Sequence, residues 1–523
     1  MKRNIFKIVA AGLVSVSLAS CSKKLDLLPT NDVTAAQVYS TPAGYLQAFA
    51  KVYGSYALTG NTGPAGNGDV QGIDEGTSDF VRLYWNAQEL TTDEAVCAWG
   101  DPGVPDLHNM NWSSTNPILT GLYYRSYYQI TLCNDFINQS SDANLASRGI
   151  TGASADSIRT YRAEARFLRA FQYSVVMDLF GDVPFVTEKD ALGSVLPPQI
   201  KRASLFNYIT GELKAIEPSL VPAGKNAYGR ADQGAEWALL ARLYLNAQVY
   251  TGTAKFDSAI TYSSKVIGAG YSLIPDYTNL MLADNNLNTS EFILTVNYDG
   301  VKTQGYGGTT FLTHSPVGGS MTAKNYGIGG GWSGNRVTSG LIKLFPDPNG
   351  NGDKRAEFYT PGQSLDINSI TSFTDGYAVT KYRNITHAGA LGQSLDFSDI
   401  DFPLFRLAEM YLIYAEATLN GGAGGTQTQA LQYVNMLRQR AGAATLSSIS
   451  LQDILDERGR ELYWEGFRRT DLIRYNQFVE GSYLWPWKGG VQTGTSVAAY
   501  RKLFPIPSAD ISSNTNLVQN PGY

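Results

Sequence analysis

Apolar residues recur at three- and four-residue spacing over much of the chain, and this period predicts α-helices. The expected helices cover residues 41–58, 117–139, 161–180, 451–465 and 470–478. Thr41 followed by Pro42 is typical of a helix start, because a threonine side chain caps the first turn and proline fits there. Gly181 marks a helix end. The sequence therefore predicts a mainly α fold.

Two pairs of short helices share the spacing of small and apolar residues that is found in tetratricopeptide units. The first pair covers residues 237–250 and 254–267. The second begins at Leu407 and continues beyond the glycines of 421–425. An ordinary helical hairpin uses the same spacing, so that alternative stays open. We expect a tetratricopeptide-like helical-hairpin scaffold.

The helical pattern stops between the two pairs. Residues 286–400 are rich in Gly, Ser, Thr and Asn, whereas short alternating segments at 292–296 and 377–382 predict strands. We therefore expect an insertion that contains loops and β-structure. The predicted division is a helical scaffold at 41–285 with ligand-binding loops at 61–116, the insertion at 286–400, and a C-terminal helical scaffold and tail at 401–523.

The N-terminus predicts export and lipid anchoring. A basic start precedes the apolar run 8–19, which is too short to span ~30 Å of hydrocarbon, so residues 1–20 are interpreted as a signal peptide. Residues 18–21 look like a lipobox ending in Cys21. Two acyl chains on that cysteine would anchor residues 21–40 as a lipidated tether. A plain cleaved signal with an accidental cysteine is the alternative.

Composition narrows the range of partners. The net charge is −5 and 17% of the residues are charged, which does not suit nucleic-acid binding, since a phosphate-tracking surface needs clustered basic residues. Aromatic residues make up 12% of the chain and 53 residues are glycine, as expected of an extracellular surface with stacking sites on ordered loops. Cys97 and Cys133 could pair, but two separate buried thiols are the favoured interpretation.

Signals for catalysis are weak. His108, His314 and His387 are far apart and lack paired spacing, so a zinc site is not expected, and no GxSxG motif indicates a serine hydrolase. A glycosidase needs two cooperating carboxylates. The adjacent acids at 74–75 and 93–94 point in different directions, and we expect them to be hydrogen-bonding groups.

Aromatic residues on expected loops give the positive signal. Trp85, Trp99 and Trp112 are spread through a stretch rich in Gly, Asp and Asn, and Tyr306 and Trp332 lie in the insertion. Flat rings stack on the apolar face of a pyranose, while neighbouring polar side chains bond its hydroxyls. The alternative is that each ring anchors its loop in the core.

Several segments together resemble the SusD/RagB family. They are the lipobox and residues 163–170, 179–185, 407–417, 457–474 and 505–523. The resemblance runs in order over nearly the whole chain. It implies a SusD-like fold without enzymatic activity, an outer-membrane location through the lipid anchor, and delivery of cargo to a SusC-type TonB-dependent transporter. Arg458, Arg460, Glu461 and Glu465 are expected to form ion pairs that set helices against each other.

A starch-binding member of the family resembles this chain at its ligand site. The resemblance implies a carbohydrate site made by Asp74, Arg82, Trp99, Asp101, Tyr306 and Trp332. The rings would form a curved wall for an α-1,4-glucan, so starch or malto-oligosaccharide is the expected cargo. Cys97 departs from the pattern, because the relative has a second tryptophan there. The alternatives are another glycan, a peptide, or a glycoside hydrolase at the outer membrane.

The same resemblance implies a structural calcium ion, although no cofactor is required. Asp399 and Asp401 match two of the relative's acids, and Asn286 stands in the loop that would supply another ligand. Hard oxygen ligands suit Ca²⁺.

Overall fold

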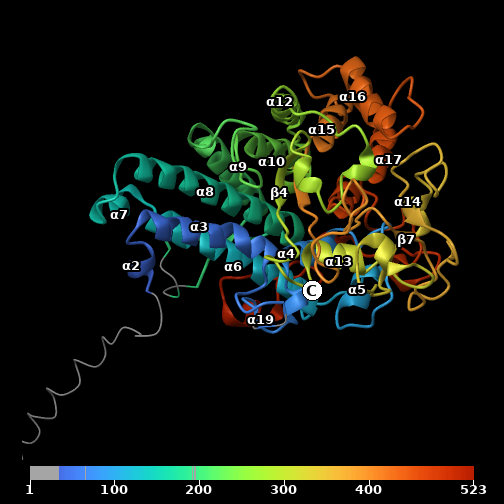
Figure 1. Cartoon of the computed structure of the whole chain (residues 1–523), viewed down its shortest axis with the longest axis horizontal. Helices are drawn as coiled ribbons and strands as arrows, with labels where there is room; N and C mark the ends of the chain where they lie inside the picture. Colours follow the sequence, from blue (N-terminus) through green and yellow to red (C-terminus); the bar gives the residue numbers. More distant parts are fainter. Residues whose placement is uncertain (1–33, 65, 67, 191–192, 194–195) are drawn as a thin grey trace, which may run out of the picture.

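The computed structural model describes residues 34–64, 66, 68–190, 193 and 196–523. Three long helices pack on one another at one side of the molecule (Figure 1): α3 (Pro42–Ala57), α6 (Pro117–Gln139) and α8 (Gly152–Phe180). The Thr41 hydroxyl accepts a hydrogen bond from the Gly44 amide at 3.2 Å, and α6 has the predicted bounds. The structure confirms the mainly helical fold.

The start of α8 differs from the prediction. The helix begins at Gly152 instead of residue 161, because buried Ala155 and Ile158 continue its inner face towards the N-terminus. Its end is as predicted. Gly181 has a φ of 77°, and a Cβ atom there would lie 2.8 Å from the Leu503 side chain. Only glycine meets both demands.

A second group of helices forms a continuous stack. Its members are α9 (Arg202–Ile216), α10 (Gln233–Leu245), α12 (Phe256–Ile267), α15 (Leu407–Leu419), α16 (Gln427–Arg440) and α17 (Leu451–Leu462). Helix α10 packs on α12, and α12 packs on α15, so the two predicted hairpins are neighbours although the insertion separates them in sequence. Figure 1 shows α15, α16 and α17 together at the upper right. The helix expected over 237–250 is divided at Asn246, where α11 (Ala247–Thr251) begins.

The strands are short and form two-stranded ladders. These are β1 (Val96–Cys97) with β5 (Asn335–Arg336), β2 (Val183–Pro184) with β3 (Gln199–Ile200), β4 (Phe292–Val296) with β8 (Phe402–Arg406), and β6 (Phe358–Tyr359) with β7 (Ala378–Val379). Strand β4 has its predicted bounds, whereas the strand expected at 377–382 is reduced to β7. The β4–β8 ladder brings the two ends of the insertion together. The β1–β5 ladder joins the insertion to the segment before α6.

The other α-helices in the described part of the chain are shorter. They are α2 (Ala35–Val38), α4 (Phe80–Gln88), α5 (Val104–His108), α7 (Asp142–Ser147), α13 (Gly308–His314), α14 (Ser339–Ile342), α18 (Arg468–Arg474) and α19 (Ser508–Ser513). Two of them, α4 and α5, lie within the segment 61–116 that was expected to be loop. Asp79 caps α4, since its Oδ1 accepts a hydrogen bond from the Arg82 amide at 3.0 Å.

Buried ion pairs hold the insertion to the C-terminal helices. Glu461 on α17 is fully buried and pairs with Arg406 at 2.6 Å, with Arg355 at 3.2 Å and with Arg440. Glu465 pairs with Arg406 at 2.7 Å. The prediction that Glu461 and Glu465 form ion pairs between elements is therefore confirmed. The same prediction is confirmed for Arg458, which pairs with Asp471 of α18 at 2.6 Å.

Two buried carboxyl groups support the loop before β1. Glu89 accepts hydrogen bonds from the Gly466 amide at 2.5 Å and the Phe467 amide at 3.0 Å, and Glu94 accepts one from the Trp464 amide at 3.1 Å. Burial raises the pKa of Glu89 to about 7, and burial together with the neighbouring Glu89 raises the pKa of Glu94 well above its ordinary value. The pair therefore retains a proton at neutral pH.

This pair predicts a pH-dependent stability. A carboxyl group with a raised pKa in the folded state loses its stabilising contribution as pH rises from its unfolded value through its folded value. We expect the free energy of unfolding to fall as the pH rises above about 5, and Glu94→Gln, which mimics the protonated acid, to reduce that fall. Urea unfolding across this pH range measures both, and parallel curves for the two proteins would contradict the prediction.

Candidate functional site

Three aromatic side chains from two distant segments lie in a row. The ring centroids of Trp99 and Trp332 are 6.3 Å apart with planes tilted by 48°, and those of Trp332 and Tyr306 are 6.4 Å apart with a tilt of 58°. Tyr306 is 41% exposed, and both tryptophans are partly exposed. The row therefore presents three successive rings to solvent, each turned relative to the next.

The β1–β5 ladder positions Trp99. This residue follows β1, and its indole Nε1 donates a hydrogen bond to the Trp332 carbonyl at 3.0 Å. A Cβ atom at Gly334 would lie 2.3 Å from the Trp99 ring, so glycine is required there for the close approach. On its other side Trp332 packs against His314 of α13, with centroids 4.9 Å apart. The two tryptophans are thus fixed by backbone contacts from both segments.

Arg82 on α4 connects the remaining parts of the site. Its Nη1 donates to the Tyr306 carbonyl at 3.1 Å, and its guanidinium lies over the Phe311 ring at 4.8 Å and the Trp99 ring at 5.8 Å. A Cβ atom at Gly76 would lie 2.7 Å from the Tyr306 Cβ, so this loop is packed against the tyrosine. Arg82 therefore contacts both ends of the row and holds them in place.

Two exposed aspartates complete the predicted set. Asp74 caps a 3-10 turn by accepting a hydrogen bond from the Thr77 amide at 3.3 Å, and Asp101 lies just beyond Trp99 in sequence. Both line a pocket of about 290 Å³ together with Arg82 and Trp99. Since Trp332 and Tyr306 adjoin Trp99 directly, the structure brings all six predicted carbohydrate-binding side chains into one region.

Two of the tryptophans considered as loop rings belong to the core. Trp85 is fully buried on α4, with Phe311 at 5.3 Å and Trp464 at 4.9 Å between ring centroids. Trp112 is 1% exposed and packs on Phe504. Neither can stack on a ligand, because other side chains cover their faces.

Sequence reasoning missed three polar or aromatic residues of the region. Phe311 lies beneath Arg82 and Trp99, and Asn86 and Asn335 line the pocket. Asn86 stands one helical turn after Arg82, so recognition of α4 would have placed it on the same face. Phe311 and Asn335 carry no such signal, since their helix and strand are short.

The cysteines are separate, as expected. Cys97 and Cys133 are both free and buried. Burial raises the pKa of each thiol to about 12, so both are protonated and unreactive at neutral pH. Cys97 also lines the pocket beside Trp99. Cys21 lies outside the described residues.

The two aspartates expected to hold calcium accept hydrogen bonds within the protein. Asp399 accepts hydrogen bonds from the Gly300 and Gln393 amides at 2.8 and 2.6 Å, and Asp401 accepts them from the Tyr298 amide and the Tyr228 hydroxyl, both at 2.8 Å. Each carboxylate oxygen is thus already engaged, and Asn286 is exposed to solvent. Within the described ranges no group of three or more His, Cys, Asp or Glu side chains could hold a metal ion. The calcium ion that the resemblance implies therefore stays a prediction.

Three of the acids considered for a glycosidase form buried ion pairs or hydrogen bonds within the protein. Asp93 is fully buried and bonds Arg468 at 2.6 Å, while Glu94 supports the Trp464 amide. Glu75 is buried and accepts a hydrogen bond from the Thr59 hydroxyl. These carboxylates position backbone and helices, and they do not flank the aromatic row as a working pair.

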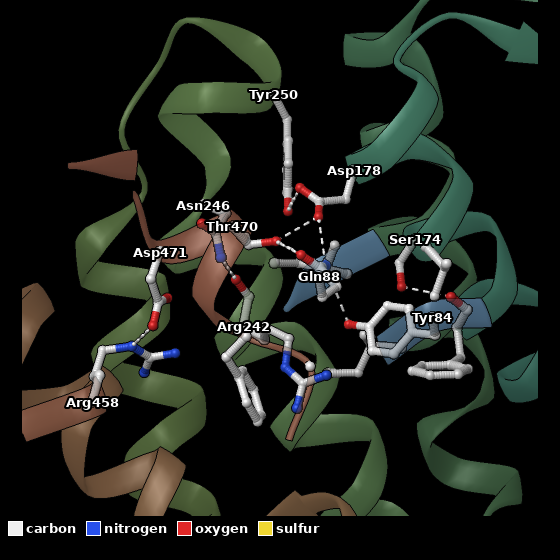
Figure 2. Close-up of a pocket in the computed structure, with 16 residues that line it drawn as sticks. Tyr84, Gln88, Ser174, Asp178, Arg242, Asn246, Tyr250, Arg458, Thr470 and Asp471 are labelled. Carbon is white, nitrogen blue, oxygen red and sulfur yellow. Dashed lines mark hydrogen bonds and ion pairs between the residues drawn. The ribbon is translucent and has the colours of Figure 1, made fainter. Parts of the chain in front are cut away.

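A cavity between α4, α8, α10 and α18 is unrelated to the row. Figure 2 shows Asp178 in its wall, where it accepts hydrogen bonds from the Tyr250 hydroxyl at 3.0 Å, the Gln88 amide at 3.2 Å and the Thr470 hydroxyl at 2.6 Å. Its volume of about 40 Å³ suits water and excludes a sugar ring. The cavity is a polar junction between helices.

Comparisons of sequence and structure both find proteins of the SusD type. Residues 352–523 match the model of the SusD family. The chain is 36% identical over 571 aligned residues to the starch-binding protein SusD of Bacteroides thetaiotaomicron, covering 100% of this chain and 99% of the relative. Among solved structures, surface glycan-binding protein A from Bacteroides uniformis superposes with a TM-score of 0.70 at 21% identity, covering 92% of this chain and 99% of that one. The same-named protein from Bacteroides thetaiotaomicron, in complex with laminarihexaose, gives 0.67 at 22%, covering 91% and 99%. The two structural likenesses concern the fold.

Proposed function

Because this chain belongs to the SusD family of non-catalytic glycan-binding proteins, we propose that it binds starch and malto-oligosaccharides at the row formed by Trp99, Trp332 and Tyr306. The observation that carries the proposal is the row itself, in which partly exposed rings lie 6.3 and 6.4 Å apart and each is tilted relative to the next. The full-length identity with a starch-binding relative supports the choice of glucan.

The geometry suits a coiled glucose polymer. Successive glucose units would place their C–H faces on successive rings, and the tilts of 48° and 58° would follow the curvature of an α-1,4-linked chain. Arg82, Asp74 and Asp101 would bond the equatorial hydroxyls at the edge of the row. Each stacking contact is weak, so binding to a polymer gains from several sites acting together.

We place this activity at the outer membrane. The lipobox that ends in Cys21 supports a diacylated anchor. Among the described residues, no helix combines the length and apolar character needed to cross a membrane. The family relationship supports transfer of captured malto-oligosaccharide to a SusC-type TonB-dependent transporter.

Affinity electrophoresis tests the proposed cargo. Native gels that contain amylopectin, laminarin, xylan or dextran would be compared with a gel that contains no glycan. We expect retardation in amylopectin alone, because the spacing and tilt of the rings are proposed to match the coil of an α-1,4-glucan. Retardation in laminarin instead would identify a SusD-like binder of another glycan, and unchanged migration in every gel would favour a peptide or other cargo.

A further inference from the structure

The pocket lined by Asp74, Arg82, Trp99 and Asp101 adjoins the aromatic row. The pocket of about 290 Å³ beside Trp99 is bounded by the loop that carries Asp74, the helix that carries Arg82 and the strand that carries Cys97. Its size is near the ~300 Å³ lower end of the range for small-molecule sites. Trp99 belongs to both the row and the pocket wall, and Arg82 lines the pocket and contacts two residues of the row, so a ligand on the row lies next to the pocket.

A buried amide in the pocket wall lacks a protein partner. Asn86 is 3% exposed, and among the described residues none hydrogen-bonds its side-chain amide. Asn86 lines the pocket. Buried polar groups are normally paired, so an unpartnered amide at the pocket indicates a missing ligand.

The wall chemistry matches one sugar unit. Asn86 offers both a donor and an acceptor, Arg82 offers a donor, and Asp101 adds a carboxylate, which is what adjacent hydroxyl groups require. Pro102 and Ile118 supply apolar surface for the C–H groups of a pyranose. An unsubstituted apolar ligand would leave the polar groups unpaired, and an anion would face Asp74 and Asp101.

We infer that this pocket holds a pendant glucosyl unit, meaning a glucose residue that projects from the chain stacked on the row. The inference rests on the proposed function and deepens it. A pendant unit arises from an α-1,6 branch or from a chain end, and both present free hydroxyls. The pocket would therefore make the protein prefer glucans that carry such units.

The pocket is open because the side chain of Cys97 is small. Cys97 is 1% exposed in β1, and its side chain forms part of the pocket wall. An indole ring at this position would project into the same volume. Substitution of Cys97 by tryptophan would thus exchange the pocket for a further stacking surface.

Isothermal titration with three probes tests the inference. β-Cyclodextrin has neither branch nor end, 6-O-α-glucosyl-β-cyclodextrin adds one branch unit, and maltoheptaose adds ends. We expect the wild type to bind the glucosylated ring about tenfold more tightly than the parent ring, as one or two net hydrogen bonds would give. Asn86→Ala should abolish that gain and leave β-cyclodextrin binding unchanged. Asn207→Ala, the same substitution on the exposed face of α9, is the matched control.

The results for the three probes distinguish between the possible ligands of the pocket. If Asn86→Ala weakens the glucosylated ring, the pocket takes a branch, and if it weakens maltoheptaose alone, the pocket takes a chain end. Equal wild-type affinity for both rings, with maltoheptaose unaffected by Asn86→Ala, would overturn the inference while the proposed function stands. Failure of every probe to bind would instead remove the proposed function. Cys97→Trp should also abolish the preference for the glucosylated ring over the parent ring. If Cys97→Trp does not fold, Asn86→Ala still tests the inference.

Discussion

A Trp99→Ala/Trp332→Ala double variant should lose about 100-fold in affinity for malto-oligosaccharide and migrate freely in amylopectin gels. Aromatic contacts contribute about 0.5–1.5 kcal/mol each beyond the area that they bury, and this variant removes two adjacent rings. It also removes the 3.0 Å hydrogen bond from the Trp99 indole to the Trp332 carbonyl and the ring contact between Trp332 and Tyr306. Titration with maltoheptaose measures the change directly.

The control for this variant is Trp237→Ala. Trp237 is another partly exposed tryptophan, on α10, whose indole nitrogen donates to Glu217 at 2.8 Å. It lies outside the row, so its removal should leave glucan affinity unchanged. If both variants remained folded and bound glucan like the wild type, the aromatic row would not be the binding surface.

Replacing Glu461 by glutamine should lower the free energy of unfolding by about 3–5 kcal/mol, because three arginines would lose their shared buried partner. The carboxylate bonds Arg406 at 2.6 Å, Arg355 at 3.2 Å and Arg440, and it is 0% exposed. Its glutamine analogue keeps the shape and removes the charge. Guanidinium unfolding of the two proteins at neutral pH measures the difference.

The pH dependence of this variant provides a second measurement. Burial acts to raise the pKa of Glu461, but Arg440, Arg406 and Arg355 outweigh it and hold the pKa well below the ordinary range. A lowered pKa contributes stability above the unfolded value that is lost as pH falls. The gap between wild type and variant should therefore narrow below about pH 4. Glu480→Gln, at an exposed site, should match the wild type throughout, and a similar loss in both variants would contradict the role of the buried pairs.

Long periodic elements could be predicted from the sequence, whereas short ones could not. Helix α6 and strand β4 have their expected bounds, because apolar residues mark each along its whole length. Helix α4 was missed, since its nine residues lie among Gly- and Asp-rich loops and depend on packing against α6 and α13 for stability. Without α4, neither Arg82 nor Asn86 could be given a direction from periodicity.

The site was predictable only as far as the family resemblance reached. Periodicity did not distinguish Trp85, which is covered by Phe311 and Trp464, from Trp99, which remains partly exposed. The difference arises from contacts with segments hundreds of positions away in the chain. The calcium ion stays a prediction, and the matching acids at 399 and 401 did not indicate that backbone amides donate hydrogen bonds to both carboxylates.

The β4–β8 ladder has a consequence for modular exchange. Because the insertion leaves and rejoins the scaffold at paired strands, it has the form of a cassette that could be transplanted between relatives to transfer specificity. Two basic residues of the insertion restrict such a graft. Arg355 pairs with Glu457 of α17 at 2.6 Å, and Lys381 pairs with Glu465, just after α17, at 2.7 Å. A functional chimera must therefore carry these anchoring cations along with the loops that contact the glycan.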